Sequence, residues 1–131
     1  MGTVAVTKES FEDTVAASEI MLVDFWASWC GPCRMFAPVF EKVAEEHPDI
    51  TFAKVDTEDQ PELAGAFRVQ SIPTLMVIRD HVVLYAQPGA IPEAALRDLV
   101  EQVRAVDMDE VHRAIAEEQA SQAPSVEGTV A

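Results

Sequence analysis

Positive charge is scarce in this chain. Nine Lys and Arg residues stand against 23 Asp and Glu residues among 131, which leaves a formal net charge of −14 at pH 7. Nucleic acids and anionic membrane surfaces attract proteins through basic side chains, so this composition argues against both as partners. The charge favours solubility, but it does not point to a particular function.

Long apolar segments are missing as well. No stretch approaches the roughly 20 apolar residues that a membrane-spanning helix requires. Residues 1–10 also lack the hydrophobic centre of a secretory signal peptide. We therefore expect a cytoplasmic protein, in a compartment where thiols stay reduced and a lone cysteine pair is more often catalytic than structural.

Cysteine occurs only twice, and both residues lie in the stretch 29–33, Trp-Cys-Gly-Pro-Cys. A C-x-x-C pair can be half of a zinc site, but zinc needs four ligands. The chain has no other cysteine and only three histidines, none of them at ligand spacing. The pair follows an apolar run and precedes apolar residues at helical spacing, which is the context of a redox motif. The sequence thus favours a redox-active disulfide, Cys30–Cys33, with no metal and no further cofactor.

The hydrophobic pattern predicts one α/β domain, and 131 residues with 49% hydrophobic composition are enough for a real core. We expect strands at residues 4–6, 20–26, 51–55, 74–79 and 82–87, and helices after Thr7, from Cys33 to about His47, at residues 62–67 and from about Pro92 to 106. Pro38 lies inside the second helix, where a kink is expected. The order βαβαβα, then ββα, predicts a mixed five-stranded sheet covered by helices on both faces, in three α/β/α layers. The C-x-x-C pair then lies at a strand's carboxyl end, the usual place for a site in an open α/β sheet.

The sequence closely resembles the thioredoxin family over residues 3 to 106. The matching stretches, in the family's order and at about its spacings, are Val23 to Cys33, Ala37-Pro38, Ala53 to Asp56, Ile72-Pro73-Thr74 and Gly89-Ala90. The resemblance implies the thioredoxin fold and a general protein-disulfide reductase activity. Two positions depart from the family pattern: the turn at Asp80-His81 lacks the usual glycine, and Pro88 stands where the family commonly has a valine. Because Pro88 removes a backbone donor beside the expected substrate groove, the choice of client proteins stays open.

Disulfide exchange requires a thiolate, and a free cysteine is mostly protonated at neutral pH. The N-terminus of the helix after the motif presents unpaired N–H groups and a positive dipole end, which stabilise an anion. We expect Cys30, on an exposed turn facing that end, to be the nucleophile. Cys33 lies one turn into the helix and is expected to be more buried, so it would resolve the mixed disulfide.

Asp24 is the only charged residue in the strand 20–26. A carboxylate in an apolar strand has a raised pKa and can accept a proton near neutral pH. The resemblance implies that Asp24 deprotonates Cys33, through a water molecule, and that Lys54 on the neighbouring strand brings its ammonium toward Asp24 and tunes it. The alternatives are an aspartate that caps the next turn and a lysine that extends into solvent.

The resemblance also implies a substrate-binding surface around Cys30. It places a cis peptide bond between Ile72 and Pro73, so that Ile72 offers its backbone N–H and C=O to an extended client segment. An ordinary trans proline at the start of a strand is the alternative. The expected substrate-binding residues form a flat, mostly uncharged surface: Trp29, Gly31, Pro32, Ile72, Pro73, Gly89 and Ala90.

Residues 107–131 have no counterpart in a minimal thioredoxin, and we interpret them as an acidic extension of a domain that spans residues 1–106. Asp107 and Glu110 fit a capping box. Three apolar residues lie on one helical face: Met108, Val111 and Ile115. We expect a helix at 108–117 that forms because this stripe docks on the body or on a second copy of the chain.

The helix is expected to fray after Glu117, since Glu117 and Glu118 oppose the helix dipole, and residues 120–131 are expected to be disordered. A solvated acidic tail with no role is the alternative. We expect a monomer, with a weak dimer possible through the extension.

Two functions of different classes are compatible with this pattern. In the first, the chain is an electron carrier that reduces client proteins and is recharged by a flavin-dependent thioredoxin reductase. In the second, it is a thioredoxin-fold binding or chaperone module whose partner contacts matter more than redox turnover. The intact pair of Cys30 and Cys33, together with Asp24, favours the first.

Overall fold

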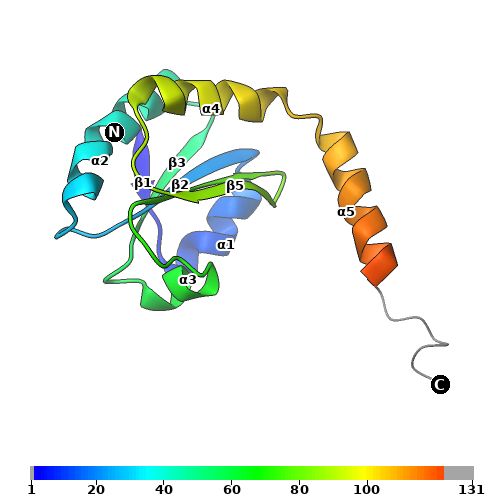
Figure 1. The fold of residues 1–131 in the computed structure, drawn as a ribbon, viewed down its shortest axis with the longest axis horizontal. Coiled ribbons are helices and arrows are strands. Elements are labelled where there is room, and N and C mark those ends of the chain that lie inside the picture. The colour runs from blue at the N-terminus through cyan, green and yellow to red at the C-terminus, as the bar shows by residue number, and fades with distance from the viewer. Residues whose placement is uncertain (1, 123–131) are drawn as a thin grey trace.

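A five-stranded mixed sheet lies between two pairs of helices in the computed structural model, which describes residues 2–122 (Figure 1). The elements are β1 (Thr3–Ala5), α1 (Lys8–Ala17), β2 (Ile20–Trp26), α2 (Gly31–Glu46), β3 (Thr51–Asp56), α3 (Pro61–Ala66), β4 (Thr74–Arg79), β5 (Val82–Pro88), α4 (Glu93–Ala105) and α5 (Met108–Gln122). The expected α/β class, element order and helical extension are confirmed, with bounds that differ by one or two residues at several ends. In residues 2–122 no helix is long and apolar enough to cross a membrane.

The sheet has the strand order β1-β3-β2-β4-β5. β3 pairs in parallel with both β1 and β2, whereas β4 runs antiparallel to β2 and to β5. β2 is therefore central, and its residues from Ile20 to Phe25 are all buried. This explains its nearly unbroken apolar sequence, because a central strand with helices on both faces has no polar side.

Alternate residues of β2 belong to two different cores. Ile20 and Leu22 pack with residues of α2 and α4, such as Phe36 and Leu96. The residues between them, Met21, Val23 and Phe25, pack in a second core that includes Phe11 of α1 and Leu63 of α3. Because side chains alternate along a strand, Asp24 points to the same face as Ile20 and Leu22, the face that α2 covers.

Helix α2 begins at Gly31, two residues before the expected start at Cys33, with Cys30 as its N-cap. Proline is well tolerated in the first helical turn, where Pro32 lies, because the N–H groups there have no partner within the helix. Pro38 lies further along and cannot donate a hydrogen bond to the preceding turn. The helix nevertheless continues to Glu46.

Helix α5 is longer than expected. It extends to Gln122, so the predictions of fraying after Glu117 and of disorder from residue 120 are wrong for residues 118–122. Local hydrogen bonds explain the difference: Gln122 Nε2 donates to Glu118 Oε1 (2.9 Å), and Ser121 Oγ donates to the Glu118 carbonyl (2.9 Å). The rest of the expected disordered tail, residues 123–131, lies outside the described residues.

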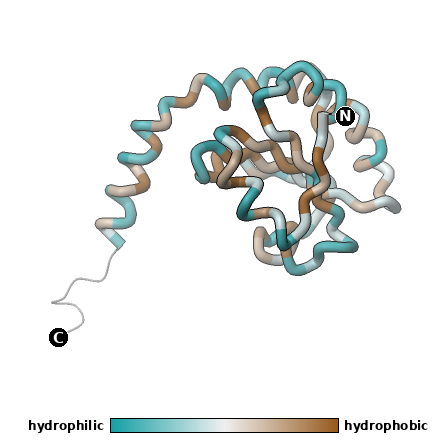
Figure 2. The backbone as a smooth tube through the Cα atoms, turned by 180° about the vertical axis from the view of Figure 1, so that it is seen from behind, coloured by the Kyte–Doolittle hydropathy of each residue, from teal (hydrophilic) through white to brown (hydrophobic). Residues whose placement is uncertain are grey.

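The start of α5 is joined to the body, but most of the helix points away from it (Figures 1 and 2). Asp107 accepts a hydrogen bond from the N–H of Glu110 (3.2 Å), which confirms it as the N-cap. Of the expected stripe, only Met108 is buried, while Val111 and Ile115 are half-buried. Docking of the whole stripe on the body is therefore not observed, although His112 in the second turn also approaches the body, with its Nε2 3.4 Å from Asp80 Oδ2.

Candidate active site

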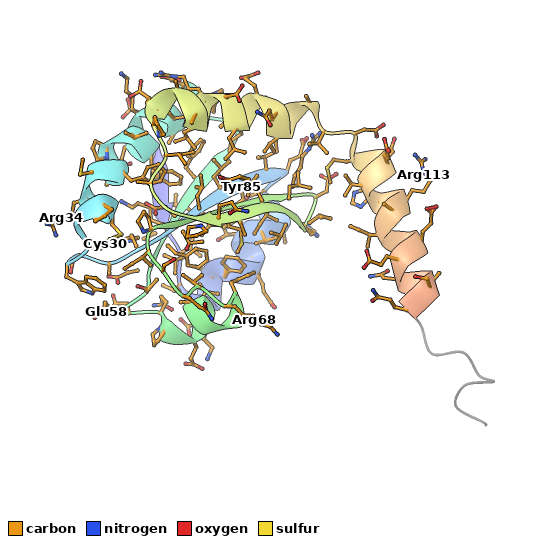
Figure 3. All side chains as sticks on the ribbon, in the orientation of Figure 1. Cys30, Arg34, Glu58, Arg68, Tyr85 and Arg113 are labelled. Atoms are coloured by element: carbon orange, nitrogen blue, oxygen red, sulfur yellow. A yellow bond between two sulfur atoms is a disulfide. The ribbon has the colours of Figure 1, made fainter. Side chains whose placement is uncertain are left out.

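Cys30 and Cys33 form a disulfide across the first turn of α2, with 5.2 Å between their Cα atoms (Figure 3). As the N-cap residue, Cys30 places its Sγ at the helix N-terminus, where it accepts a hydrogen bond from the N–H of Cys33 (3.2 Å). The same N–H and the positive end of the helix dipole would stabilise a thiolate on Cys30 once the disulfide is reduced. The structure thus supplies a helix-end donor for one sulfur of the pair.

The expected difference in exposure between the two cysteines is wrong. Cys30 is buried, with 4% of its surface exposed, and Cys33 is 2% exposed. The residue before the motif behaves differently, since Trp29 is 65% exposed. The asymmetry between the two sulfurs therefore comes from the helix-end donor and from the neighbouring chain rather than from exposure, because α2 and the loop before β4 cover both.

The loop before β4 brings the expected substrate-binding residues to the disulfide. The Ile72–Pro73 peptide bond is cis, as expected. The Ile72 carbonyl oxygen lies 3.7 Å from Sγ of Cys30, and Ile72 packs against the cluster of Ala27 and both cysteines. On the other side, the N–H of Gly89 donates a hydrogen bond to the Pro73 carbonyl (2.7 Å), which holds the end of β5 beside this loop.

These residues differ in how accessible they are to a client. The exposed ones are Trp29, Pro32, Gly89 and Ala90, while Gly31 and Ile72 are half-buried and Pro73 is buried. Gly89 has φ of 102°, a conformation that glycine adopts without steric strain and other residues rarely adopt. The expected substrate-binding residues beside Cys30 are thus all uncharged, and four of them are exposed.

Asp24 is fully buried in the middle of β2. Neither of its carboxylate oxygens has a hydrogen-bond partner among the described residues. Burial raises the pKa of Asp24 to about 7, and the positive charge of Lys54 opposes that rise. A carboxyl group with this pKa exchanges its proton at neutral pH, as an acid–base catalyst must.

Lys54 lies directly across from Asp24 in the β2–β3 pairing. Its ammonium is nevertheless placed elsewhere, with Nζ 5.2 Å from the centroid of the Trp26 ring. The expected influence of Lys54 on Asp24 is electrostatic, and no hydrogen bond joins the two, since the carboxylate has no partner in the described part of the chain. Lys54 acts on the pKa of Asp24 through its charge alone.

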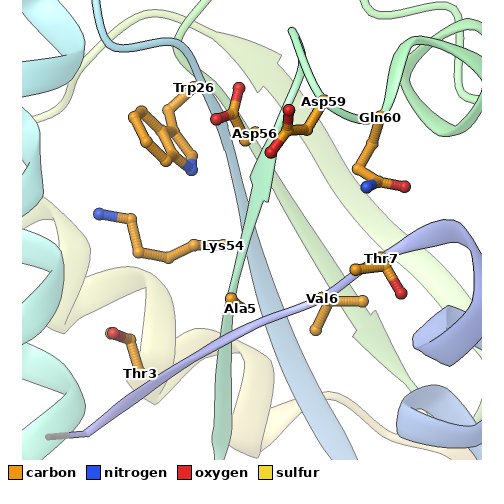
Figure 4. A pocket seen from close by; sticks show the side chains of 9 residues that line it. All are labelled: Thr3, Ala5, Val6, Thr7, Trp26, Lys54, Asp56, Asp59 and Gln60. Carbon is orange, nitrogen blue, oxygen red and sulfur yellow. The ribbon is translucent and has the colours of Figure 1, made fainter.

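Trp26 was not among the residues that the sequence assigned to the site. The structure shows it half-buried and packed against the cluster of Ala27, Cys30 and Cys33. It also lines a surface pocket together with Lys54 (Figure 4). The sequence feature that could have placed Trp26 in the site is its position two residues after Asp24, because residues i and i+2 of a strand face the same way.

A family model decides the relationship. The model of the thioredoxin family matches residues 2–102. The chain belongs to the thioredoxin family. A putative thioredoxin 2 from Streptomyces coelicolor is 61% identical over 118 residues, a match that covers 90% of this chain and 88% of the relative. A thioredoxin from Mycobacterium tuberculosis is 47% identical over 96 residues, covering 72% of this chain and 83% of the relative.

Solved thioredoxin structures show the same fold. A mutant thioredoxin from Halobacterium salinarum matches with a TM-score of 0.72 at 36% identity, covering 76% of this chain and 88% of that one. Plasmodium falciparum thioredoxin matches with a TM-score of 0.70 at 31% identity, covering 75% and 96%. The expected thioredoxin fold is confirmed, and this thioredoxin carries its disulfide at the start of α2.

The similarity to the Streptomyces protein reaches beyond the thioredoxin domain. A match of 118 residues cannot fit into the first 107 residues of this chain, so it must extend into α5. The family model, in contrast, ends at residue 102. The extension is thus a feature that this thioredoxin shares at least in part with one relative, while the division into residues 1–106 and 107–131 stays a prediction.

This thioredoxin is a protein-disulfide oxidoreductase, as its family, its thioredoxin relatives and its Cys30–Cys33 disulfide together show. The alternative of a binding or chaperone module is not favoured, because the redox pair is intact. Within residues 2–122, no group of three or more His, Cys, Asp or Glu side chains is arranged to hold a metal ion. That the protein works without any cofactor beyond its own disulfide stays a prediction.

Proposed function

We propose that Cys30 and Cys33 divide the reduction of a client disulfide between them. The Cys30 thiolate attacks one client sulfur, so that a Cys30–client disulfide forms while the client's own S–S bond breaks. The released client thiolate takes a proton from solvent. The observation that carries this assignment is the hydrogen bond from the N–H of Cys33 to Sγ of Cys30, since a donor at a helix N-terminus favours the anionic sulfur.

The second step returns the pair to the oxidised state. Cys33 loses its proton to Asp24, and its thiolate attacks Sγ of Cys30, which expels the second client thiolate. The client has then gained two electrons, and the Cys30–Cys33 disulfide has formed again. Asp24 suits the role of base because burial brings its pKa to about 7 and because it points to the sheet face that α2, with Cys33, covers.

An extended client segment would bind across the cis peptide of Ile72 and Pro73. Ile72 has its carbonyl oxygen 3.7 Å from Sγ of Cys30, so backbone pairing at this residue would place a client sulfur close to the nucleophile. Trp29, Gly31, Pro32, Gly89 and Ala90 would contact the flanking client residues. Since this surface is mostly uncharged, it suits clients of varied sequence.

Thioredoxins work with a thioredoxin reductase and with client proteins, and both are partners of this chain in our proposal. Two electrons from a flavin-dependent reductase would reopen the Cys30–Cys33 disulfide after each turnover. The absence of a spanning helix in residues 2–122 and the bacterial thioredoxin relatives support a place in the cytoplasm, where such a reductase keeps thiols reduced.

Reduction of insulin tests the function. With dithiothreitol as electron source, the full-length protein should accelerate the appearance of turbidity from the insulin B chain. A variant with both Cys30→Ser and Cys33→Ser, checked for native folding by circular dichroism, should give the rate of dithiothreitol alone. An equal rate for the wild type and this variant would contradict a reductase function.

A further inference from the structure

The pairing of β2 with β3 gives Lys54 two possible partners on one face of the sheet. Asp24 lies directly across from Lys54, and Trp26 lies across from Asp56, two pairs further along. Asp24 and Trp26 point the same way because they are two residues apart in a strand. A long side chain reaches both the residue directly opposite and the diagonal one, so Lys54 can contact either Asp24 or Trp26.

Lys54 contacts Trp26. Its Nζ lies 5.2 Å from the centroid of the indole, within the range of an attractive cation–π interaction. The buried carboxylate across from it has no hydrogen-bond partner on either oxygen within the described residues. The lysine therefore lies over an aromatic ring although an unpaired carboxylate is directly opposite on the neighbouring strand.

The surroundings of the two positions explain this choice. Lys54 and Trp26 are half-buried and line a surface pocket with Asp56 and Asp59, so the ammonium stays partly hydrated there (Figure 4). At Asp24, which is fully buried, the ammonium would lose that water, and desolvation offsets much of what an ion pair gains.

The other elements around Asp24 supply no competing charge. β4 places the apolar Leu75 directly across from it. The buried residues of α2, which covers this face, include Phe36 and the disulfide-bonded Cys33. Among the described residues, Lys54 is the one charged side chain that acts on the titration of Asp24.

We propose that Trp26 is a positioning residue for the redox reaction: its indole holds the Lys54 ammonium out of direct contact with Asp24, so that the buried carboxyl forms no ion pair. This inference rests on the proposed role of Asp24 as a base. A carboxylate paired with an ammonium would be a weaker base, because an opposite charge within ~4–6 Å favours its ionised form. By holding Lys54 away, Trp26 keeps the proton affinity of Asp24 close to that of a thiol that must be deprotonated near neutral pH.

A double-mutant cycle on the full-length oxidised protein tests the inference. Trp26→Leu is made in the wild type and in a Lys54→Met background, and the titration of the Asp24 carboxyl is followed by infrared spectroscopy or carbon-13 NMR. Loss of the indole alone should release the ammonium and lower the pKa of Asp24 by about 1 pH unit more than the same change in the Lys54→Met background. The Lys54→Met background lacks the ammonium, so the shift measured there reports only the altered hydration of Asp24. Subtracting it isolates the effect of Lys54. Equal shifts in the two backgrounds would overturn the positioning role.

Two further variants keep the test decisive even if Trp26→Leu fails to fold. Trp26→Phe retains a ring with a weaker cation–π attraction, so it should shift the pKa in the same direction by less. Lys54→Met alone should raise the pKa of Asp24 by well under 1 pH unit, because its ammonium is already held away. A rise of ~1–3 pH units would mean that Lys54 pairs with Asp24, which contradicts the inference. Trp29→Leu, a tryptophan with no lysine over it, is the matched control and should leave the titration unchanged.

The titration does not depend on turnover, so the role of Trp26 and the reductase function are tested separately. A missing coupling in a protein that reduces insulin would remove the role of Trp26 and leave the reductase function. A measured coupling in a protein that does not reduce insulin would leave the Trp26–Lys54–Asp24 relationship and remove the proposed function. Where both hold, the pH profile for resolving the mixed disulfide should move to lower pH in Trp26→Leu and return in the Lys54→Met background.

Discussion

The backbone N–H of Cys33 donates a hydrogen bond to Sγ of Cys30 over 3.2 Å. The two residues are the third helical position and the N-cap of α2, so the sulfur takes the place that a serine or aspartate oxygen occupies in ordinary helices. One cysteine of the pair therefore has its anion stabilised by the backbone of the other. This relationship, rather than exposure, distinguishes two sulfurs that are both buried.

Cys30→Ser should abolish insulin reduction, whereas Cys33→Ser should still attack a client and then remain linked to it. The reason is that only Cys30 has the helix-end donor, while Cys33 completes the exchange. Mass spectrometry of each variant after exposure to an oxidised client checks this outcome. Adducts on Cys33 in the Cys30→Ser protein would reverse the assignment.

Asp24→Asn should stabilise the oxidised protein at high pH and slow the resolution of mixed disulfides. Burial raises the pKa of Asp24 from 3.8 to about 7, so the folded protein holds this proton more tightly than the unfolded chain does. The contribution of protonated Asp24 to the free energy of unfolding is fully present below pH ~4 and is lost as the pH rises through about 7. The variant should thus gain up to about 4 kcal/mol over the wild type at pH 9 and little at pH 4.

Urea unfolding of both proteins across this pH range measures the difference, and the single-turnover rate of resolution measures the base role. A stability gain that is the same at pH 4 and pH 9 would show that Asp24 titrates normally. A wild-type resolution rate for Asp24→Asn between pH 6 and 8 would show that another group takes the proton of Cys33.

Arg79→Met should loosen the joint between α4 and α5. Arg79 Nη1 donates to the carbonyl oxygens of Val103 (2.7 Å), Arg104 (3.1 Å) and Val106 (3.1 Å), at the C-terminal end of α4. Without this cation, three carbonyls lose a charged donor, and we expect a loss of about 1–3 kcal/mol in the free energy of unfolding.

Arg113→Met is the matched control, since Arg113 is exposed on α5 and should change the stability by less than about 0.5 kcal/mol. Equal effects of the two substitutions in urea unfolding would show that Arg79 does not hold the joint.

Truncation after Val106 should leave insulin reduction intact and lower the free energy of unfolding by roughly 1–3 kcal/mol. The loss corresponds to the burial of Met108, which is 7% exposed, and to the contact of His112 with Asp80, while most other residues of α5 are exposed. Amide exchange in the full-length protein gives an independent measure, because the first turn of α5 should exchange more slowly than residues 118–122. Uniformly slow exchange along α5 would point to a second copy of the chain docked on Val111 and Ile115.

Local patterns were sufficient for the order of elements and for the two core faces. The apolar run of β2 and the helical spacing in α2 report burial directly, because they reflect which side chains avoid water. The start of α2 could have been placed better, since Pro32 in the first turn is itself a helix-start signal. The end of α5 was misjudged because the charge of Glu117 and Glu118 was weighed without the hydrogen bonds that Glu118 accepts from Ser121 and Gln122.

The sequence by itself determined the chemistry, because a C-x-x-C pair between a strand and a helix and an aspartate within an apolar strand are local features. Only the tertiary structure decided which groups surround them. The pairing of β2 with β3 offers Lys54 both Asp24 and Trp26, and the difference in hydration between a half-buried ring and a fully buried carboxylate selects the ring. The direction of α5 was settled in the same way, by contacts between distant parts of the chain that no local pattern contains: Arg79 donates to carbonyls at the end of α4, and His112 lies against Asp80.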